Sequence, residues 1–276
     1  MKRFILSIFA ILITSFSWAQ EDLVYILQPF TEQTEIVYTD MEIPFYKRSG
    51  EKKIAGKIPA AQSLRVENVM NSDDEDLNKY MAVNYQEKTV YVEKKNVAFK
   101  KIRTKENDFY FRIGAFYLGG EYNNSLLYLT SIPHNANYQT DSFAFPLVTD
   151  EGLIDIKVFD NKGLKDITNL IQIDYQGEYC GAESGDSWLY WSAMDGFNQL
   201  ADLIGWADMD YIAERFIFPT DEGGKSGKII YEIEHGVLED DTVDADYKIT
   251  KKQKTYTLKN GKLNPEFTSL ITTLNR

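Results

Sequence analysis

Residues 154–175 read IDIKVFDNKGLKDITNLIQIDY, and this stretch decides the fold class. Apolar and polar residues alternate over 154–159 and again over 170–175. A period of two places the apolar side chains on one face of a β-strand. Between the two runs, residues 160–163 (Asp-Asn-Lys-Gly) include Asn and Gly, which accept a positive φ at little cost. The stretch therefore predicts two antiparallel strands joined by a turn.

The same pattern extends over the rest of the C-terminal two thirds. Short aromatic or β-branched runs typical of strands occur at 109–113, 126–129, 142–147, 188–191, 216–218, 229–233 and 255–258. Further turns are expected at Met194-Asp195-Gly196, Glu222-Gly223-Gly224 and Asn260-Gly261. Residues 197–204 suit one or two helical turns and equally a strand. We therefore predict a mainly β protein, with an acidic antiparallel meander over 106–276 that is sandwich- or barrel-like and contains little helix.

The N-terminus has the pattern of a secretory signal peptide. Lys2 and Arg3 precede an apolar run over 4–16, and Ser17 and Ala19 supply the small residues of a cleavage site. We expect residues 1–19 to be removed and the product to be periplasmic or secreted; an uncleaved N-terminal anchor is the alternative. No later run approaches eighteen apolar residues, so no transmembrane segment is expected in the mature chain.

Composition excludes several classes of function. The chain has 30 Lys+Arg against 42 Asp+Glu, a net charge of -12, whereas nucleic-acid binders need clustered bases. A single Cys excludes an intramolecular disulfide, and two His exclude a His-rich metal site. The acidity is concentrated in residues 106–246, which hold 27 acids and seven bases, while residues 247–276 are basic. A cation or a basic protein is therefore the partner that the second module favours.

Three stretches resemble the bacterial SH3-like (SH3b) family: residues 53–59 (KIAGKIP), the hairpin-like stretch 80–92 and the run Lys94-Lys95-Asn96-Val97. Two positions depart from the family pattern: Val90 stands where a glycine precedes Tyr91, and Tyr80 stands where a tryptophan is usual. The resemblance implies a small SH3-like barrel, with an N-terminal leader, over residues 20–103.

Members of that family commonly target cell-wall or peptide ligands, which the resemblance implies here too. Its groove would be lined by four tyrosines, Tyr46, Tyr80, Tyr85 and Tyr91. The alternative for these side chains is ordinary barrel core or cross-strand pairing.

Cys180 and His235 are the candidate pair for a cysteine peptidase of the cell wall, the enzyme class that often accompanies SH3-like modules. Their separation of 55 residues suits such a pair. The sequence after Cys180, Gly-Ala-Glu-Ser-Gly, predicts no helix that would lower the pKa of the thiol. A small buried Cys and a surface His are the alternative reading.

Acidic residues supply the other candidate chemistries. Asp208, Asp210 and Glu214 follow Trp206, and a glycosidase needs two carboxyls in an aromatic cleft, which Trp188 and Trp191 would help to line. Calcium prefers oxygen ligands on glycine-containing loops, which makes Asp208, Asp210, Asp221 and Glu222 weak candidate ligands. Solvated acidic loops explain the same residues, and we expect no cofactor other than such a calcium ion.

These observations favour an exported, non-enzymatic binding protein of the cell envelope. Its ligand would be a protein, a peptide or a glycan, and the acidic second module points to a basic partner. The alternative is a cell-wall hydrolase, either a cysteine peptidase using Cys180 and His235 or a carboxylate-based glycosidase. No nucleotide-binding loop motif occurs in the chain.

Overall fold

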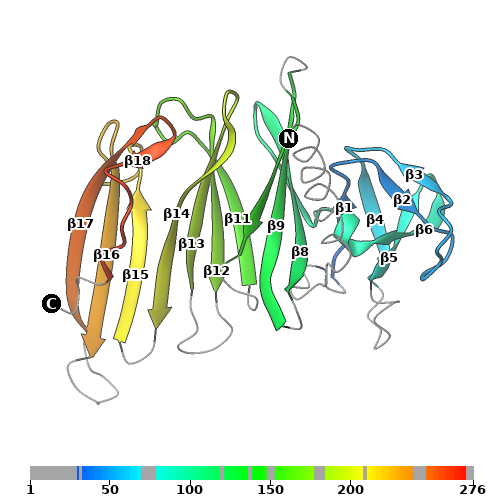
Figure 1. Ribbon diagram of the computed structural model, residues 1–276, viewed down its shortest axis with the longest axis horizontal. Helices are drawn as coiled ribbons and strands as arrows, with labels where there is room; N and C mark the ends of the chain where they lie inside the picture. Colours follow the sequence, from blue (N-terminus) through cyan, green and yellow to red (C-terminus); the bar gives the residue numbers. More distant parts are fainter. Residues whose placement is uncertain are drawn as a thin grey trace, which may run out of the picture. The chain divides into compact units, whose positions relative to one another are not determined.

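A computed structural model gives the fold (Figure 1). It describes residues 30, 33–69, 79–118, 121–135, 139–147, 153–176, 184–207, 210–238 and 247–271. The expected signal peptide, Cys180, Asp208 and the acidic loop at 239–246 lie outside these residues. Within the described part of the chain, no helix is long and apolar enough to cross a membrane.

The chain divides into two compact units, each made of several segments. The first unit comprises Met1–Arg103, Asp108–Ser131 and Phe143–Asp150; the second comprises Thr104–Asn107, Ile132–Ser142 and Glu151–Arg276. One change of unit thus falls at the boundary predicted near residues 103–106. The segments 108–131 and 143–150, however, are grouped with the N-terminal residues rather than with the acidic domain.

The first unit contains two small antiparallel sheets. The larger has the order β1-β4-β5-β6 and the smaller pairs β2 with β3. The strands are β1 (Ile36–Tyr38), β2 (Ile43–Phe45), β3 (Gly56–Ile58), β4 (Ser63–Asn68), β5 (Tyr80–Tyr85) and β6 (Lys88–Glu93). Their alternating apolar side chains form one core that includes Ile43, Ile58, Met81, Val83 and Val92. The strands expected at 54–58, 64–69, 80–85 and 89–92 are therefore present, while the SH3-like assignment stays a prediction.

A second four-stranded sheet has the order β10-β9-β8-β7. Its strands are β7 (Lys100–Arg103), β8 (Asn107–Leu118), β9 (Glu121–Pro133) and β10 (Asp141–Pro146). Within the first unit, Asp40 joins β8 and β9 through its side chain. Its Oδ2 accepts hydrogen bonds from Arg112 Nε at 2.9 Å and from the Thr130 hydroxyl at 2.6 Å. This ion pair is buried, with the Asp40 and Arg112 side chains 2% and 13% exposed.

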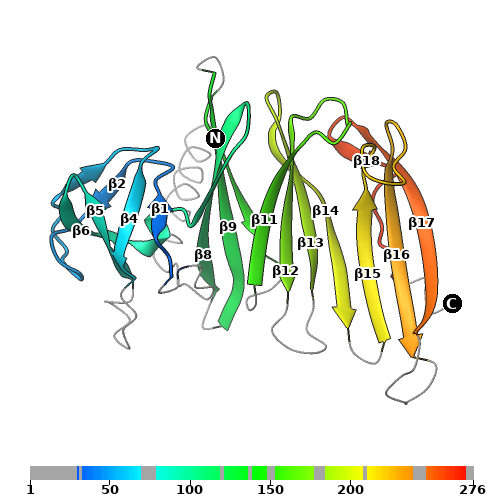
Figure 2. The ribbon, with the colours of Figure 1, turned by 180° about the vertical axis from the view of Figure 1, so that it is seen from behind.

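The largest sheet has eight strands in chain order, each antiparallel to the next (Figures 1 and 2). They are β11 (Leu153–Asp160), β12 (Asn169–Gln176), β13 (Ser184–Ser192), β14 (Gly196–Ala207), β15 (Asp210–Ile217), β16 (Ile229–Leu238), β17 (Tyr247–Lys259) and β18 (Lys262–Asn264). The predicted antiparallel meander is therefore confirmed for residues 153–264, while residues 107–146 belong to a separate sheet. Residues 197–204, which the sequence left open between helix and strand, lie in β14.

The predicted turns occur where glycine or asparagine supplies a positive φ. Gly163 has φ +81° in the turn after β11, and an added Cβ would lie 3.0 Å from Pro219 Cβ. Asn260 and Gly261, at φ 51° and 72°, form the two-residue turn between β17 and β18. Two positive φ values in succession are the geometry of the tight hairpin that an Asn-Gly pair favours.

An aromatic core lies in the second unit. Phe267, in the segment after β18, meets the rings of Phe216, Tyr231 and Tyr256 at centroid distances of 5.6, 5.3 and 5.7 Å. These separations are in the range in which aromatic pairs attract beyond their buried area. The C-terminal segment therefore packs against the sheet through this ring, together with Leu270 and Ile271.

The basic segment predicted near the C-terminus is β17. It pairs with β16 from Tyr247 to Tyr256, and the Lys251 ammonium forms an ion pair with Glu234. β18 pairs only with residues 257–259, so within the described chain residues 247–256 form the outer edge of the sheet.

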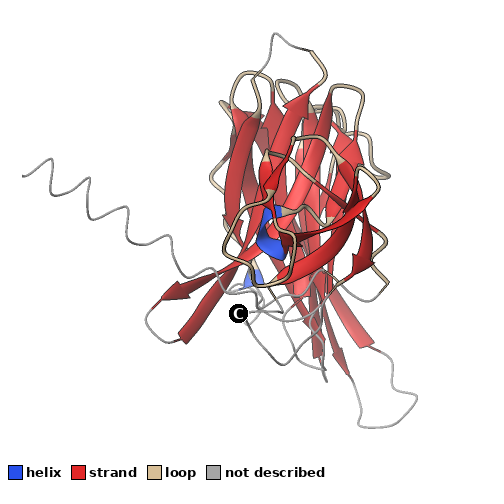
Figure 3. Ribbon diagram, turned by 90° about the vertical axis from the view of Figure 1, so that its right-hand side faces the viewer, coloured by secondary structure: helices blue, strands red, loops and turns tan. Residues whose placement is uncertain are grey.

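Strands make up most of the regular secondary structure of the described chain (Figure 3). A short 3-10 turn at Lys94–Asn96 follows β6. The expectation of a mainly β protein with antiparallel sheets and little helix is thus confirmed for the described residues.

Candidate functional site

The four tyrosines expected to line a groove make two separate groups of contacts. Tyr46 is 7% exposed, forms a backbone bridge with Tyr91, and meets the ring of Tyr80 edge-on at 5.5 Å. Burial, followed by the nearby Glu93 carboxylate, raises the pKa of Tyr46 to about 12. Tyr85 instead packs on Phe45 at 5.9 Å. These contacts are those of the core and cross-strand alternative, and ligand binding by the four residues stays a prediction.

His235 lies on β16, where its Nε2 is 3.4 Å from the Asp210 Oδ2. Its side chain is 16% exposed. Cys180 lies outside the described residues, so the structure does not test the proposed Cys–His pair.

The candidate calcium ligands have different surroundings. Asp221 accepts a hydrogen bond from the backbone N–H of Phe218 at 2.9 Å and pairs with the Lys162 ammonium at 2.7 Å, so it fixes a turn. Glu222 is exposed, and Asp210 faces His235. Among the described residues, no group of three or more His, Cys, Asp or Glu side chains is placed to hold a metal ion.

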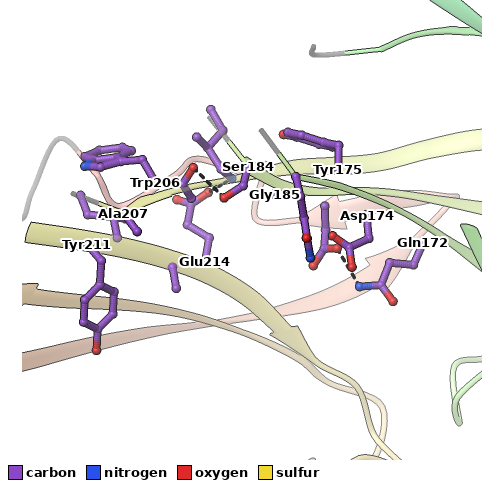
Figure 4. A pocket seen from close by; sticks show the side chains of 15 residues that line it. Gln172, Asp174, Tyr175, Ser184, Gly185, Trp206, Ala207, Tyr211 and Glu214 are labelled. Carbon is purple, nitrogen blue, oxygen red and sulfur yellow. Dashed lines mark hydrogen bonds between the residues drawn. The ribbon is translucent and has the colours of Figure 1, made fainter. Parts of the chain in front are cut away.

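A pocket of about 370 Å³ lies in the eight-stranded sheet, where β12 and β14 end and β13 and β15 begin (Figure 4). It is lined by residues of the neighbouring strands β12, β13, β14 and β15. Gln172 and Asp174 lie toward one end of the pocket in Figure 4, and Trp206 and Tyr211 toward the other. Its volume is at the lower end of the range of small-ligand sites.

Three carboxylates are aligned across the strands beside this pocket. The strand register places Asp155 opposite Asp174, and Asp174 opposite Asp186. Directly opposed residues of antiparallel strands point to the same face, so like charges there destabilise the sheet. Gln172 Nε2 donates to Asp186 Oδ1 at 2.7 Å, and the Lys157 ammonium lies 3.4 Å from Asp155 and 3.9 Å from Asp174. We call Asp155, Asp174 and Asp186 the aspartate row.

Burial raises the pKa of the Asp186 carboxyl, and the neighbouring Asp174 raises it further, while the Gln172 hydrogen bond lowers it. The Lys157 ammonium also lowers it, so the Asp186 carboxylate is desolvated and only partly compensated. A cation placed in the pocket would add to this compensation.

Gly185 allows the pocket wall to form. A Cβ at this residue, which has φ +153°, would lie 2.0 Å from the Leu203 carbonyl oxygen and 2.9 Å from the Tyr175 hydroxyl. The Tyr175 hydroxyl donates across this position to the Leu203 carbonyl at 3.2 Å. The absence of a side chain at Gly185 thus lets β12 reach the backbone of β14.

Glu214, at the pocket, is 8% exposed and has partners for both carboxylate oxygens. Oε2 accepts from the Ile204 N–H at 2.9 Å, and Oε1 accepts from the hydroxyls of Tyr231 and Ser269. Burial, followed by the hydrogen bond to Glu214, raises the pKa of Tyr231. The ladder between β14 and β15 covers only residues 205–207 and 211–213, and Glu214 bonds the β14 backbone beyond it. Glu214 is therefore a structural acid of the pocket.

The three tryptophans considered for a sugar cleft do not line one cleft together. Trp188 is buried against Phe159 and Phe218, at 6.0 and 4.8 Å. Trp191 is also buried, whereas Trp206 is half-buried and lines the pocket at the end away from Asp174 (Figure 4).

No protein-family model matches the chain, and neither a curated protein nor a solved structure matches it. The site must therefore be interpreted from its own chemistry. Two acids on neighbouring strands, an indole at the other end of the pocket and a pocket of this size suit a ligand that carries an ammonium or guanidinium group.

Sequence reasoning placed the partner surface on the acidic second module but missed Asp174 and Asp186. Asp174 lies at a polar position of an alternating strand, and Asp186 precedes the strand expected at 188–191, so both looked like ordinary solvent-facing residues. Their alignment depends on the strand register, which the sequence alone does not give.

Proposed function

We propose that the chain is an exported, non-enzymatic binding protein whose pocket receives a lysine or arginine side chain of a basic partner. The observation that carries the proposal is the aspartate row beside the pocket. Opposed carboxylates cost stability, and the Lys157 ammonium beside Asp155 and Asp174 offsets this cost only in part. A bound ammonium or guanidinium would turn that cost into charge-assisted hydrogen bonds.

Trp206 supports the same ligand class. A cation above an indole face gains a cation–π interaction, and among aromatic side chains tryptophan gives the strongest. The wider acidity of residues 106–246 would draw a basic protein toward the pocket before contact is made. Attraction of this kind is screened over about 10 Å at 0.1 M salt, so association should weaken as salt rises.

The experiment uses hexa-lysine and hexa-arginine peptides as probes, titrated calorimetrically into the chain without residues 1–19. The test variant is D174N/D186N. The matched control is D160N/E222Q, which removes two negative charges at exposed positions outside the pocket.

We expect the pocket variant to lose about tenfold or more in affinity, because charge-assisted bonds contribute about 1.5–3 kcal/mol each. The control should change affinity by no more than about twofold, which reflects the general field alone. Equal effects of both variants would show that net charge, not the pocket, binds the peptide. Release of fragments from purified peptidoglycan would instead support the hydrolase alternative.

A further inference from the structure

The outer edge of β17, residues 247–256, runs for ten residues without a neighbouring strand in the described part of the chain (Figures 1 and 2). On its other side β17 pairs with β16 in an unbroken antiparallel register. The open edge of a sheet presents backbone N–H and C=O groups that can bind a further strand. The side chains along the edge then decide which strand fits.

The turn after β17 indicates which backbone groups point outward. A two-residue turn with positive φ at both positions, such as Asn260-Gly261, joins two residues that exchange backbone hydrogen bonds. The register makes these residues Lys259 and Lys262, so the backbone groups of Lys259 point toward β18, on the outer side of β17. This direction alternates along a strand. Odd-numbered residues from 247 to 255 therefore point their backbone groups outward, and even-numbered residues bond β16.

Lysines occupy one face of this edge. Side chains alternate between the two faces of a strand, so Lys248, Lys252 and Lys254 share a face, which we call the lysine face. The β16 residues directly opposite Lys248 and Lys254 are Val237 and Tyr231, neither of which is acidic. Acids of a strand added at the outer edge would be directly opposed to these lysines, an arrangement that stabilises a sheet.

The other face of the edge carries exposed apolar side chains. Tyr247 and Ile249 are 40% and 52% exposed, and the Tyr247 ring meets the ring of Tyr211 edge-on at 5.2 Å. Lys251, on the same face, forms an ion pair with Glu234 of β16. On this face an added strand would therefore be matched by apolar side chains, which would cover Tyr247 and Ile249.

We propose that the outer edge of β17 binds an extended segment of another protein in which acidic and β-branched residues alternate. The acids lie opposite the lysine face, and the β-branched residues cover Tyr247 and Ile249. The bound segment also accepts hydrogen bonds from the outward N–H groups of β17. This surface shares no residue with the pocket and is independent of the proposed recognition of basic side chains.

The probe is a ten-residue peptide of alternating glutamate and valine with blocked ends, titrated into the chain without residues 1–19. One control peptide has the same composition in two blocks, and a second has lysine in place of glutamate. The net negative charge of the chain repels the probe at long range. The titration is therefore made at about 0.15 M salt, where this repulsion is screened over about 8 Å. Calorimetry gives the affinity, and amide hydrogen exchange by NMR identifies the strand that is contacted.

We expect the alternating peptide to bind with a Kd below about 1 mM, and both control peptides to bind at least about tenfold more weakly. Bound peptide should slow amide exchange at residues 249, 251, 253 and 255, whose N–H groups point outward. Exchange at residues 250, 252 and 254 should change less, because these residues pair with β16 with or without the peptide.

Two pairs of variants separate the backbone from the charge. Ile249→Pro removes an outward N–H, which an edge strand tolerates, while the matched control Ile249→Ala keeps it. Both variants lose the isoleucine side chain, so I249P should bind about fivefold more weakly than I249A for want of one hydrogen bond. K248Q/K254Q should weaken binding about three- to tenfold, because two opposed charge pairs are lost. The control K225Q/K228Q, at exposed positions before β16, should bind like the parent chain.

Unchanged exchange at the odd-numbered amides would overturn the proposal, as would equal binding of I249P and I249A. Equal binding of the block peptide would show attraction by charge alone and would also overturn it. Slow exchange at these amides without peptide, increasing with protein concentration, would show that a second copy occupies the edge instead. If I249P does not fold, the exchange pattern of the parent chain and the affinity of K248Q/K254Q decide. D174N/D186N should bind the peptide like the parent chain, whereas weaker binding would place the peptide in the pocket.

Discussion

Replacing Asp40 with alanine tests the buried ion pair of the first unit. Asp40 is the acceptor for both Arg112 and the Thr130 hydroxyl, at 2.9 and 2.6 Å. The substitution leaves the Arg112 guanidinium, 13% exposed, without its carboxylate, and the buried Thr130 hydroxyl loses this bond. Breaking a buried pair from one side costs about 3–5 kcal/mol, because the remaining charge stays desolvated.

The size of this effect should depend on which partners are removed. In the D40L/R112M variant both charges are replaced by apolar groups of similar length, and exchanges of this type are often neutral or stabilising. We therefore expect D40A to lose most of the stability of the first unit and D40L/R112M to regain it.

Hydrogen exchange at the amides of β5 and β8 measures this unit separately from the second. Urea unfolding of D40A and D40L/R112M then gives the free-energy differences. A D40A loss below about 1 kcal/mol would refute the reasoning, since it would mean that Arg112 is solvated as well without Asp40 as with it. A loss as large in the double variant would show that shape, not charge, matters at this position.

Three further predictions concern the second unit. Phe267→Ala should lower the free energy of unfolding by about 2–4 kcal/mol because three ring contacts disappear. F267L should recover more than half of this loss. Equal melting temperatures of F267A and the parent chain would contradict the role of this ring. Gly185→Ala should lower stability by about 1–3 kcal/mol, because the new Cβ meets the Leu203 carbonyl, and should remove the slow exchange expected of the buried Tyr175 hydroxyl proton. Hexa-lysine affinity should fall as pH is lowered through the raised pKa of Asp186, because only the ionised carboxyl attracts the cation, and D186N should flatten this profile; a pH-independent affinity would contradict it.

The sequence predicted the β-meander because its evidence is local. Alternation over 154–159 and the Asn260-Gly261 pair determine strand faces and turn geometry within a few residues. Residues 197–204 were ambiguous because a bulge beside Leu200 breaks the period of two: Trp188 pairs with Ala201 and Leu189 with Gln199.

The sites depend on contacts between residues far apart in the chain. The aspartate row needs the register of three strands, and the alternation of inward and outward backbone groups along β17 needs its pairing with β16. The grouping of 108–131 with the first unit was missed for the same reason. Arg112 follows the polar stretch near 103–106 at which the sequence predicted a domain boundary. Its charge is nevertheless compensated by Asp40, which lies 72 residues earlier in the first unit.

The outer edge of β17 is a place where a second copy of this chain could in principle extend the sheet. Residues 247–256 carry four lysines along a strand whose far side is open to solvent among the described residues. A second copy that extended the sheet there in antiparallel register would bring lysine rows together, and their repulsion would oppose pairing. We therefore expect the positive charge of this strand to oppose edge-to-edge aggregation. Acetylation of these lysines would remove the repulsion and leave an unpaired ten-residue strand edge. A chemically acetylated sample should then self-associate where the native chain does not.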